Sequence, residues 1–258
     1  GQNLGAAPAR NTGIRAGTAP YAAFVDWDDE WFPTRLEKVL RVFEGAGDHV
    51  GMVYTGAERI GVEGTVIKDV PRERDDLSHI LLTTNVIGGT SVAMVRRHAL
   101  EVVGPFDETL RYTEELDLWL RISERFAVRC LPEALVRIAQ QTLRGRLSGD
   151  LVAVSHGREM FCRKHRQALV EHRVLHLFLR ESGWVRQRDA RDPSGARRFY
   201  LKSIAARPFA PLTYALPDFF EIAGNLDVRN WIRTTQEATG GVPLDTETRG
   251  GLGDTDVS

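Results

Sequence analysis

The sequence predicts an α/β fold, with a mainly parallel sheet followed by a C-terminal helical region. Three observations support this class. Short apolar runs of strand length alternate with amphipathic helical stretches over the first 140 residues or so. After residue 150 the apolar residues recur at helical spacing only. The composition, with 42% hydrophobic and 27% charged residues, is that of a globular chain and excludes collagen-like and wholly disordered proteins.

The elements of the first half follow one another closely. Residues 8–14 are expected to form a helix that ends before Pro20, because glycine and proline stop helices. An apolar strand is predicted over 21–25, and Pro33 suits the first turn of the next helix, which ends at Gly45. The remaining predictions are strands over 50–54, 90–95 and 128–131, a strand-turn-strand over 58–68 with Gly64 near the turn, a short helix or turn at 80–82, and helices over 97–103 and 116–126.

The second half predicts helices and a tail. One long helix is expected over 151–180 and another over 193–206, and a third apolar stretch runs from 212 to 222. From Thr234 the chain is rich in Gly, Thr and Asp, which predicts disorder. The expected organisation is an α/β domain over 1–142, a helical appendage over 143–233 and a disordered tail over 234–258.

Charge is segregated along the chain although the net charge is only -1. The first 140 residues carry -5, residues 141–210 carry +9 and the remainder carries -5. The overall balance argues against a nucleic-acid binder. The basic segment is either a solvated helical face or a surface for anionic lipid head groups. No run is apolar enough for a membrane span, and two distant cysteines exclude a disulfide framework, so we expect a cytoplasmic location, with peripheral contact through 143–210 at the inner face of a membrane left open.

The sharpest chemical feature is the acidic run Asp26-Trp27-Asp28-Asp29, which directly follows an apolar strand. Ligands of open α/β sheets bind beyond the carboxyl ends of strands. Clustered carboxylates repel each other unless a cation intervenes, and Mg²⁺ commonly joins one or two carboxylates to substrate phosphates. The run therefore indicates a metal–diphosphate site. The alternative is a helix N-cap cluster, since aspartate is favoured at helix starts.

Several motifs in order give this run a context. A small-residue loop and Ala9-Arg10-Asn11-Thr12-Gly13 precede it, and Trp31-Phe32-Pro33-Thr34-Arg35-Leu36-Glu37 follows. Further along stand Gly89-Thr90-Ser91, Met94-Val95-Arg96-Arg97, Gly104-Pro105-Phe106-Asp107-Glu108 and Glu114-Glu115-Leu116-Asp117-Leu118-Trp119-Leu120-Arg121. Over residues 1–140 the chain resembles family-2 glycosyltransferases of the GT-A fold, a Rossmann-like architecture.

The resemblance implies sugar transfer from a nucleotide-diphosphate donor to a glycan or lipid-linked acceptor, in cell-envelope polysaccharide or glycoprotein assembly. Asp28 would ligate Mn²⁺ or Mg²⁺, and Asp26 would contact the metal and the nucleotide ribose. Arg10 and Asn11 would lie near the donor. The family's general base falls on Glu115, where the family usually has aspartate; Asp117 is the rival. Inversion at the anomeric carbon follows from the same resemblance.

Some family pieces are absent from the sequence. The family's nucleotide-binding strands would precede Gly1, so we expect an incomplete domain with an exposed sheet edge and weak or no donor binding. A non-catalytic glycan- or anionic-lipid-binding remnant is therefore the alternative function, and a phosphate-processing metalloenzyme is a weaker rival. His172 and His176 have an i, i+4 spacing that zinc can use, although a solvated helix face is favoured. Trp27 and Trp31 suit either stacking on a ligand or core packing.

Overall fold

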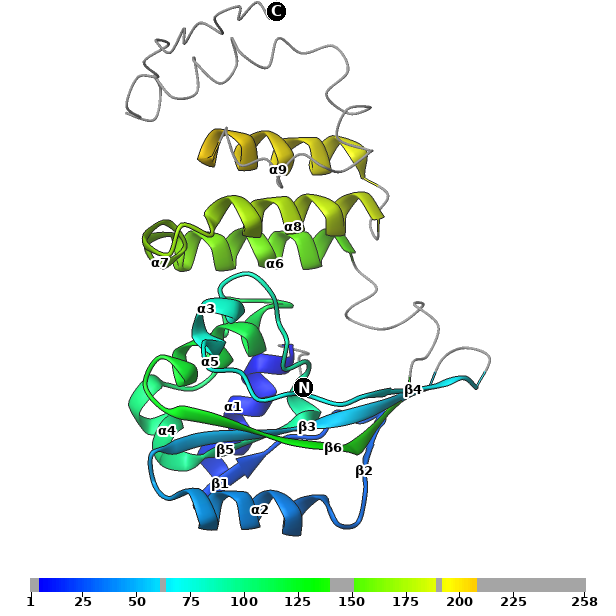
Figure 1. Ribbon diagram of the computed structural model, residues 1–258, viewed down its shortest axis with the longest axis vertical. Helices are drawn as coiled ribbons and strands as arrows, with labels where there is room; N and C mark the ends of the chain where they lie inside the picture. Colours follow the sequence, from blue (N-terminus) through cyan, green and yellow to red (C-terminus); the bar gives the residue numbers. More distant parts are fainter. Residues whose placement is uncertain (1–4, 61–63, 140–150, 189–191, 208–258) are drawn as a thin grey trace, which may run out of the picture.

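A computed structural model of the chain describes residues 5–60, 64–139, 151–188 and 192–207. A sheet with helices on both faces is followed by a stack of further helices (Figure 1). The predicted class, an α/β unit followed by a helical region, is confirmed. The third apolar stretch, the tail from Thr234 and the proposed boundary at 142/143 lie outside the described residues, and the domain division stays a prediction.

The described sheet has six strands in the order β1-β5-β3-β6-β2, with β4 beside β3. Their bounds are β1 Tyr21–Ala23, β2 Asp29–Trp31, β3 Val50–Ile60, β4 Val66–Asp69, β5 Ala93–Arg96 and β6 Ala127–Ala139. Central strand β3 is buried from Val50 to Ala57, since neighbours flank it and helices cover both faces. β1 is an outer strand of this sheet.

The prediction of a mainly parallel sheet is wrong for the described strands. Only β3 and β6 run parallel, whereas the pairs β1–β5, β2–β6, β3–β4 and β3–β5 are antiparallel. Parallel neighbours need a long crossover, and the chain between β3 and β6 supplies one with its helices. The connection between β3 and β4 is short, which suits an antiparallel hairpin.

The helices lie in two layers around the sheet. Helix α2 (Arg35–Ala46) covers one face, where Val39 and Phe43 pack on Val50 and Val53 (Figure 1). The helices α1 (Ala6–Ala16), α4 (Arg97–Val103) and α5 (Glu114–Ser123) lie on the other side, with the short α3 (Leu77–Leu81) near α5. The predicted helices at these places are confirmed. Glycines follow α2 and α4 as expected, with Gly47 and Gly104 at positive φ of 80° and 85°.

Two strands differ from their predictions in extent. The strand expected over 90–95 begins only at Ala93, because Thr90–Val92 forms a 3₁₀ turn. The strand expected over 128–131 belongs to β6, which spans 13 residues. It pairs with β3 on one side and with β2 on the other. The second half of β6 is a strand because of these pairings, which the local sequence does not predict.

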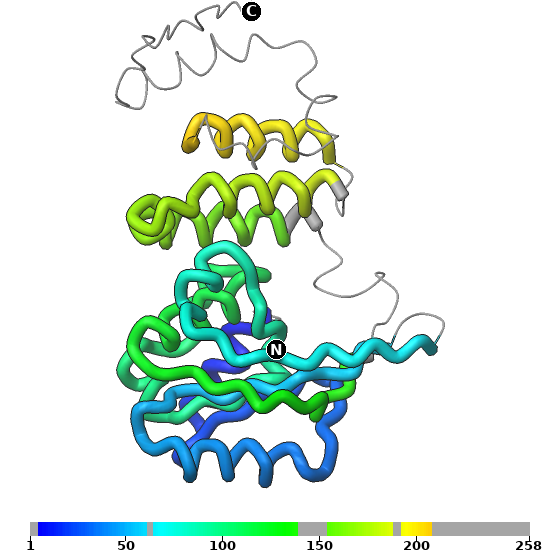
Figure 2. Tube along the Cα trace, in the orientation of Figure 1, coloured from blue at the N-terminus to red at the C-terminus, as the bar shows by residue number. Residues whose placement is uncertain are grey.

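The helical region holds α6 (Leu151–Lys164), α7 (Arg166–Glu171), α8 (Leu175–Arg188) and α9 (Pro193–Ala206), stacked beyond α5 (Figure 2). One continuous helix over 151–180 is therefore wrong. Arg173 adopts φ of 58°, a left-handed conformation that ends α7 and turns the chain into α8. His172 and His176 consequently do not share one helix face, and His172 instead lies beside His79, with 3.4 Å between their Nδ1 atoms.

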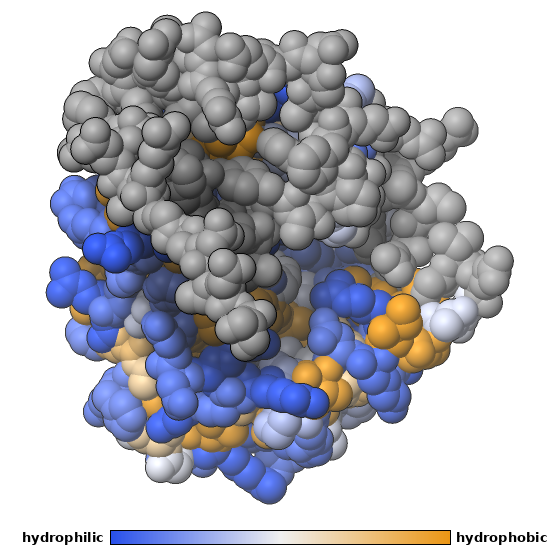
Figure 3. Space-filling model, turned by 45° about the horizontal axis from the view of Figure 1, so that its top comes forward, coloured by the Kyte–Doolittle hydropathy of each residue, from blue (hydrophilic) through white to orange (hydrophobic). Residues whose placement is uncertain are grey.

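The helical region packs directly on the α/β unit. One apolar cluster contains Leu116, Trp119 and Leu120 of α5 together with Phe161 and Phe178 of α6 and α8. On the face shown in Figure 3, hydrophilic residues surround smaller hydrophobic patches over the described part of the molecule. Among the described residues, no helix is both long and apolar enough to span a bilayer.

Candidate functional site

The acidic run forms a tight turn between β1 and β2. The amide of Asp29 donates to the carbonyl oxygen of Asp26 at 3.0 Å, which closes the turn. The amide of Asp26 donates to Ser91 Oγ, also at 3.0 Å, which ties the turn to the segment before β5. Asp26 and Asp28 are half-buried, whereas Trp27 projects from the turn with 88% of its surface exposed. The turn thus presents two carboxylates and an indole at the rim of the sheet.

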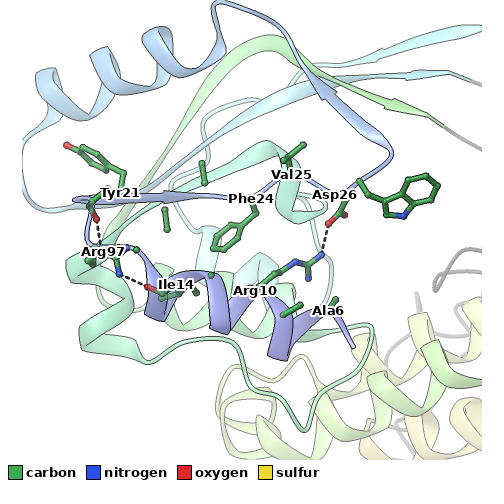
Figure 4. Close-up of a pocket in the computed structure, with 15 residues that line it drawn as sticks. Ala6, Arg10, Ile14, Tyr21, Phe24, Val25, Asp26 and Arg97 are labelled. Carbon is green, nitrogen blue, oxygen red and sulfur yellow. Dashed lines mark hydrogen bonds and ion pairs between the residues drawn. The ribbon is translucent and has the colours of Figure 1, made fainter. Parts of the chain in front are cut away.

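Arg10 joins this turn to the start of α5. Its Nη2 donates to Asp26 Oδ1 at 2.9 Å, and its Nη1 donates to Glu114 Oε1 at 3.2 Å. Figure 4 shows Arg10 extending from α1 toward Asp26. The guanidinium also lies 5.6 Å from the centre of the Phe106 ring, which helps to keep it in place. One cation therefore neutralises two carboxylates that are 88 residues apart in the sequence.

Asn11, the next residue of α1, holds the loop before α5. Its Nδ2 donates to the carbonyl oxygen of Phe106 at 2.9 Å and to Glu108 Oε1 at 2.8 Å. Its Oδ1 accepts from the amide of Phe106 at 3.0 Å. The side chain is buried, and its amide group is fully occupied by these contacts.

A cavity of about 590 Å³ lies along β1 and the adjoining face of α1 (Figure 4). Its walls are largely apolar and include Ile14, Ala22 and Phe24. Arg10 and Asp26 lie at one end, so the acidic turn opens onto this space. The arrangement resembles small-molecule sites in general, which are mostly apolar with a few placed polar groups.

The start of α5 gathers three carboxylates. Tyr112 adopts φ of 69°, an unusual value for a bulky residue, and this turn delivers Glu114 and Glu115 to the first turn of the helix. Glu114 is buried, and its Oε2 has no hydrogen-bond partner among the described residues. Desolvation and the neighbouring charge of Glu114 raise the pKa of Glu115 to about 8, although Arg10 opposes that rise.

Asp117, one turn further along α5, has a different environment. It is fully buried and accepts from Arg121 Nη2 at 2.7 Å, Lys164 Nζ at 2.7 Å and His165 Nε2 at 2.8 Å. Burial alone would raise the pKa of Asp117, but the hydrogen bond from His165 and the two cations lower it to about 2. Lys164 and His165 lie at the junction of α6 and α7, so Asp117 fastens the helical region to α5.

The donor set of the turn suits a hard divalent cation held jointly with a phosphorylated ligand. Among the described residues, no group of three or more His, Cys, Asp or Glu side chains is placed to hold a metal ion by itself. Mg²⁺ and similar cations commonly use only one or two carboxylates and take their remaining ligands from water and substrate phosphates. Asp26 and Asp28 supply two half-buried carboxylates in one turn, and Asp26 lines the open cavity.

Comparison with known proteins relates part of this chain to glycosyltransferases. The model of glycosyl transferase family 2 matches residues 1–104. An uncharacterized glycosyltransferase of Haemophilus influenzae is 29% identical over 174 residues, which are 64% of this chain and 59% of that protein. The amylovoran biosynthesis glycosyltransferase AmsB of Erwinia amylovora is 30% identical over 126 residues, which are 46% of this chain and 41% of that protein.

Residues 1–104 match the model of glycosyl transferase family 2, and the relatives found are glycosyltransferases. The resemblance inferred from the motifs is confirmed over these residues. The chain spans about half the length of the curated relatives it matches, with 59%, 44% and 44% coverage of three of them. Among solved structures, the chain is similar to the mannosyltransferase PcManGT from Pyrobaculum calidifontis in complex with GDP-Man and Mn²⁺, at 19% identity and a TM-score of 0.47, covering 91% of this chain and 64% of that one.

The structure brings together some of the predicted site residues. Arg10 contacts Asp26 and also Glu114, the neighbour of Glu115, and the charges of these three groups act on Glu115. Asn11 and Asp117 instead make buried structural contacts on either side of this group. Their functional roles, like that of Asp28, stay predictions.

Sequence reasoning missed two residues that shape the site. Glu114 was read only as the first member of the acidic pair, yet it is the partner of Arg10. Ser91, which accepts from the amide of Asp26, appeared only as part of a family-like strand. The position of Ser91 in a Gly-Gly-Thr-Ser run was the available signal, because such runs let backbones approach closely.

Proposed function

We propose that this chain carries catalytic residues of a metal-dependent glycosyltransferase. The enzyme would transfer a hexose from a nucleotide-diphosphate sugar to a glycan or lipid-linked acceptor in polysaccharide assembly, and invert the anomeric carbon. One observation carries the proposal: Arg10 holds the carboxylate of Asp26 and the carboxylate of Glu114 at 2.9 and 3.2 Å. Arg10 thus links the predicted donor-binding turn to the two glutamates, Glu114 and Glu115, that hold the proposed general base. This link supports placing the turn and the base in one site.

In the proposed mechanism Glu115 acts as the general base. Its carboxylate accepts the proton of the acceptor hydroxyl while the hydroxyl oxygen attacks the anomeric carbon. The new C–O bond forms as the bond from the anomeric carbon to the diphosphate breaks, and its electron pair leaves with the nucleotide. A pKa near 8 makes Glu115 a stronger base than an ordinary carboxylate, and general bases work best with a pKa near the operating pH.

The turn would hold the donor end of the reaction. Asp28 and Asp26 would ligate Mn²⁺ or Mg²⁺, and such an ion offsets the charge that builds on a leaving diphosphate. Arg10 orients the carboxylate of Asp26 through their hydrogen bond, and it lies where a phosphate oxygen would be attracted. Trp27, exposed beside both carboxylates, supplies a flat apolar face on which a sugar or base can stack.

Asp117 is the rival base, and its contacts favour a positioning role. Two cations and a histidine occupy its oxygens, and its lowered pKa makes it a weak proton acceptor. Glu115 is one residue after Glu114, which touches Arg10, whereas Asp117 faces the helical region. We therefore assign the base to Glu115.

Donor hydrolysis tests the proposal. The assay follows release of nucleoside diphosphate from a panel of nucleotide-sugars with Mn²⁺, using the full natural polypeptide that contains these residues. We expect Asp28→Ala to abolish turnover and Glu115→Gln to lower kcat by about 10²–10⁴-fold. Glu124→Gln, an exposed carboxylate at the other end of α5, is the matched control and should be silent. Full activity of Asp28→Ala would remove the assigned metal site.

The helical region supports a second role, binding to an anionic membrane surface. Helix α9 contains no acidic residue and exposes Arg197, Arg198 and Lys202. Each basic residue near an anionic surface contributes about 1 kcal/mol. This contact would place the enzyme at the inner face of a membrane, close to lipid-linked acceptors.

Vesicle sedimentation tests the membrane contact. The chain should sediment with vesicles containing phosphatidylglycerol and remain free with phosphatidylcholine alone. Replacing the three basic residues of α9 with glutamine removes three charges and should weaken binding about 10²-fold, by the same contribution per charge. Arg41→Glu, an exposed change on α2, should have no effect. Equal sedimentation of all variants would contradict the assignment of this face. If donor hydrolysis fails while vesicle binding persists, the non-catalytic role replaces the enzyme.

A further inference from the structure

Arg35 is a buried cation that lacks hydrogen bonds. It is the first residue of α2 and has no exposed surface. Its Nε, Nη1 and Nη2 find no hydrogen-bond partner among the described residues, and burial lowers the pKa of Arg35 to about 10. A buried charge without partners is costly, and arginine is seldom found in such a place. Something in its surroundings must therefore favour the guanidinium.

The group that faces the guanidinium is the indole of Trp31. The central carbon of the guanidinium lies 4.4 Å from the centre of that ring, within the range of a cation–π contact, which strengthens when it is shielded from water. The indole is fixed at its edge as well, since Trp31 Nε1 donates to the carbonyl oxygen of Ser91 at 3.0 Å. The indole of Trp31 is therefore held between Arg35 on its face and Ser91 at its edge.

Ser91 connects the indole of Trp31 to the acidic turn. Its Oγ accepts from the amide of Asp26 at 3.0 Å, and the residue itself is buried. The segment before it is fixed in turn, because Trp119 Nε1 and Asn85 Nδ2 both donate to the carbonyl oxygen of Gly88, at 3.3 and 3.1 Å. The backbone of Asp26 is thus tied to a well-anchored part of the core.

We propose that Arg35, Trp31 and Ser91 form a positioning network that holds the backbone of the Asp26–Asp29 turn. This role rests on the proposed function, in which the turn binds the metal and the donor diphosphate. The network reaches the main chain of Asp26, whereas Arg10 reaches its carboxylate. The carboxylate of Asp26 can therefore leave Arg10 and bind a metal ion while the backbone of the turn stays in place. A carboxylate whose backbone is already fixed binds a metal ion with a smaller entropic cost.

Amide hydrogen exchange at Asp26, followed by NMR on the 258-residue chain, tests the network without any ligand. Ser91→Ala removes the acceptor of this amide and should speed its exchange at least tenfold. Trp31→Phe keeps the ring face and removes the Nε1 donor, and Arg35→Met removes the cation. Both should speed the same amide about threefold or more, and Arg35→Lys should restore slow exchange.

Arg158→Met is the matched control. Arg158 is a second arginine stacked on an aromatic ring, 4.6 Å from the centre of Phe178, and burial lowers the pKa of Arg158 to about 10 as well. It lies in α6, far along the chain from Asp26, so its loss should lower thermal stability and leave the exchange of Asp26 unchanged. Equal effects of Arg158→Met and Arg35→Met on Asp26 would show a general loss of stability and overturn the network.

Mn²⁺ binding in the presence of GDP, measured by electron paramagnetic resonance of the free ion, gives the functional readout. The Trp31→Phe and Arg35→Met variants should bind Mn²⁺ about threefold to tenfold more weakly. This measurement, like the hydrolysis assay, uses the full natural polypeptide that contains these residues. If the unmodified polypeptide binds no Mn²⁺, the proposed function fails at this turn, and the exchange data still decide whether the network exists. If Trp31→Phe leaves the exchange rate of the Asp26 amide unchanged, the proposal is overturned. This result decides even if Arg35→Met does not fold.

Discussion

Asp117 is the charge that fastens the helical region to α5, and its replacement by asparagine tests this role. The side chain has no exposed surface and accepts hydrogen bonds from Arg121, Lys164 and His165 at 2.7–2.8 Å. Asparagine keeps the shape of the group and removes its charge. Three partners that now share one carboxylate would then lack an anion at the junction of α5, α6 and α7.

The magnitude follows from the pKa. The contacts lower the pKa of Asp117 from 3.8 to about 2, and each unit corresponds to about 1.4 kcal/mol. The ionised form therefore stabilises the fold by about 2–3 kcal/mol relative to the protonated form. Because the folded pKa lies below the unfolded one, this contribution is complete above about pH 4 and is lost as the pH falls toward 2.

Urea denaturation of the unmodified chain and of Asp117→Asn, at several pH values, measures the effect. We expect the variant to be less stable by about 2–3 kcal/mol at pH 7, and the difference to shrink toward zero near pH 2. Asp107→Asn is the control, since Asp107 also accepts from Lys164, at 2.6 Å, but is more exposed. Its loss should cost less than about 1 kcal/mol. Equal stability of the chain and Asp117→Asn at pH 7 would refute the reasoning.

Three further predictions concern the site and the packing around it. The rate of sugar transfer should rise about tenfold per pH unit below pH 7 and level off above 8, because Glu115 must lose its proton, and a flat profile would contradict its role as base. Arg10→Gln should move the midpoint of that profile upward, since the guanidinium lowers the pKa of the base; a downward shift would contradict this. Gly157→Ala should lower the free energy of unfolding by about 1–3 kcal/mol, because its Cβ would lie 1.9 Å from the carbonyl oxygen of Arg111, whereas Gly45→Ala, with open space around it, should raise it by about 0.5–1 kcal/mol in the same urea assay.

Local signals in the sequence located most helices and several strands of the α/β unit. Helix α4 begins at Arg97 and ends at Val103 as predicted, because Gly104 and Pro105 stop it. Strand β2, Asp29–Trp31, was missed because two acidic residues and a tryptophan show no apolar periodicity. The segment becomes a strand only by pairing with β6, more than a hundred residues later. The break at Arg173 was also invisible, since no glycine or proline marks it.

The candidate site was predictable as chemistry and less so as geometry. The residue types and their order pointed to Asp26 and Asp28, and the family resemblance, which the match over residues 1–104 confirms, pointed to Glu115. The roles of these residues stay predictions. That Glu114 rather than Glu115 meets Arg10 depends on how α5 enters its first turn. Arg35 gave no signal, because an arginine at a helix start is ordinarily solvated, and only the folded chain places it against Trp31.

Helix α5 links the candidate base to the helical region. Glu114 and Glu115 begin the helix, and Asp117 lies on its next turn, tied to Lys164 and His165. Thr113, just before the helix, donates from Oγ1 to the carbonyl oxygen of Gly157 at 3.2 Å. Both ends of the segment 113–117 are therefore fixed by contacts with α6 and α7. Because Glu115 lies between these two contacts, they also hold its backbone in place. The helical region thus sets the direction in which Glu115 enters the site, so a change at the α5–α6 contact should alter catalysis as well as stability.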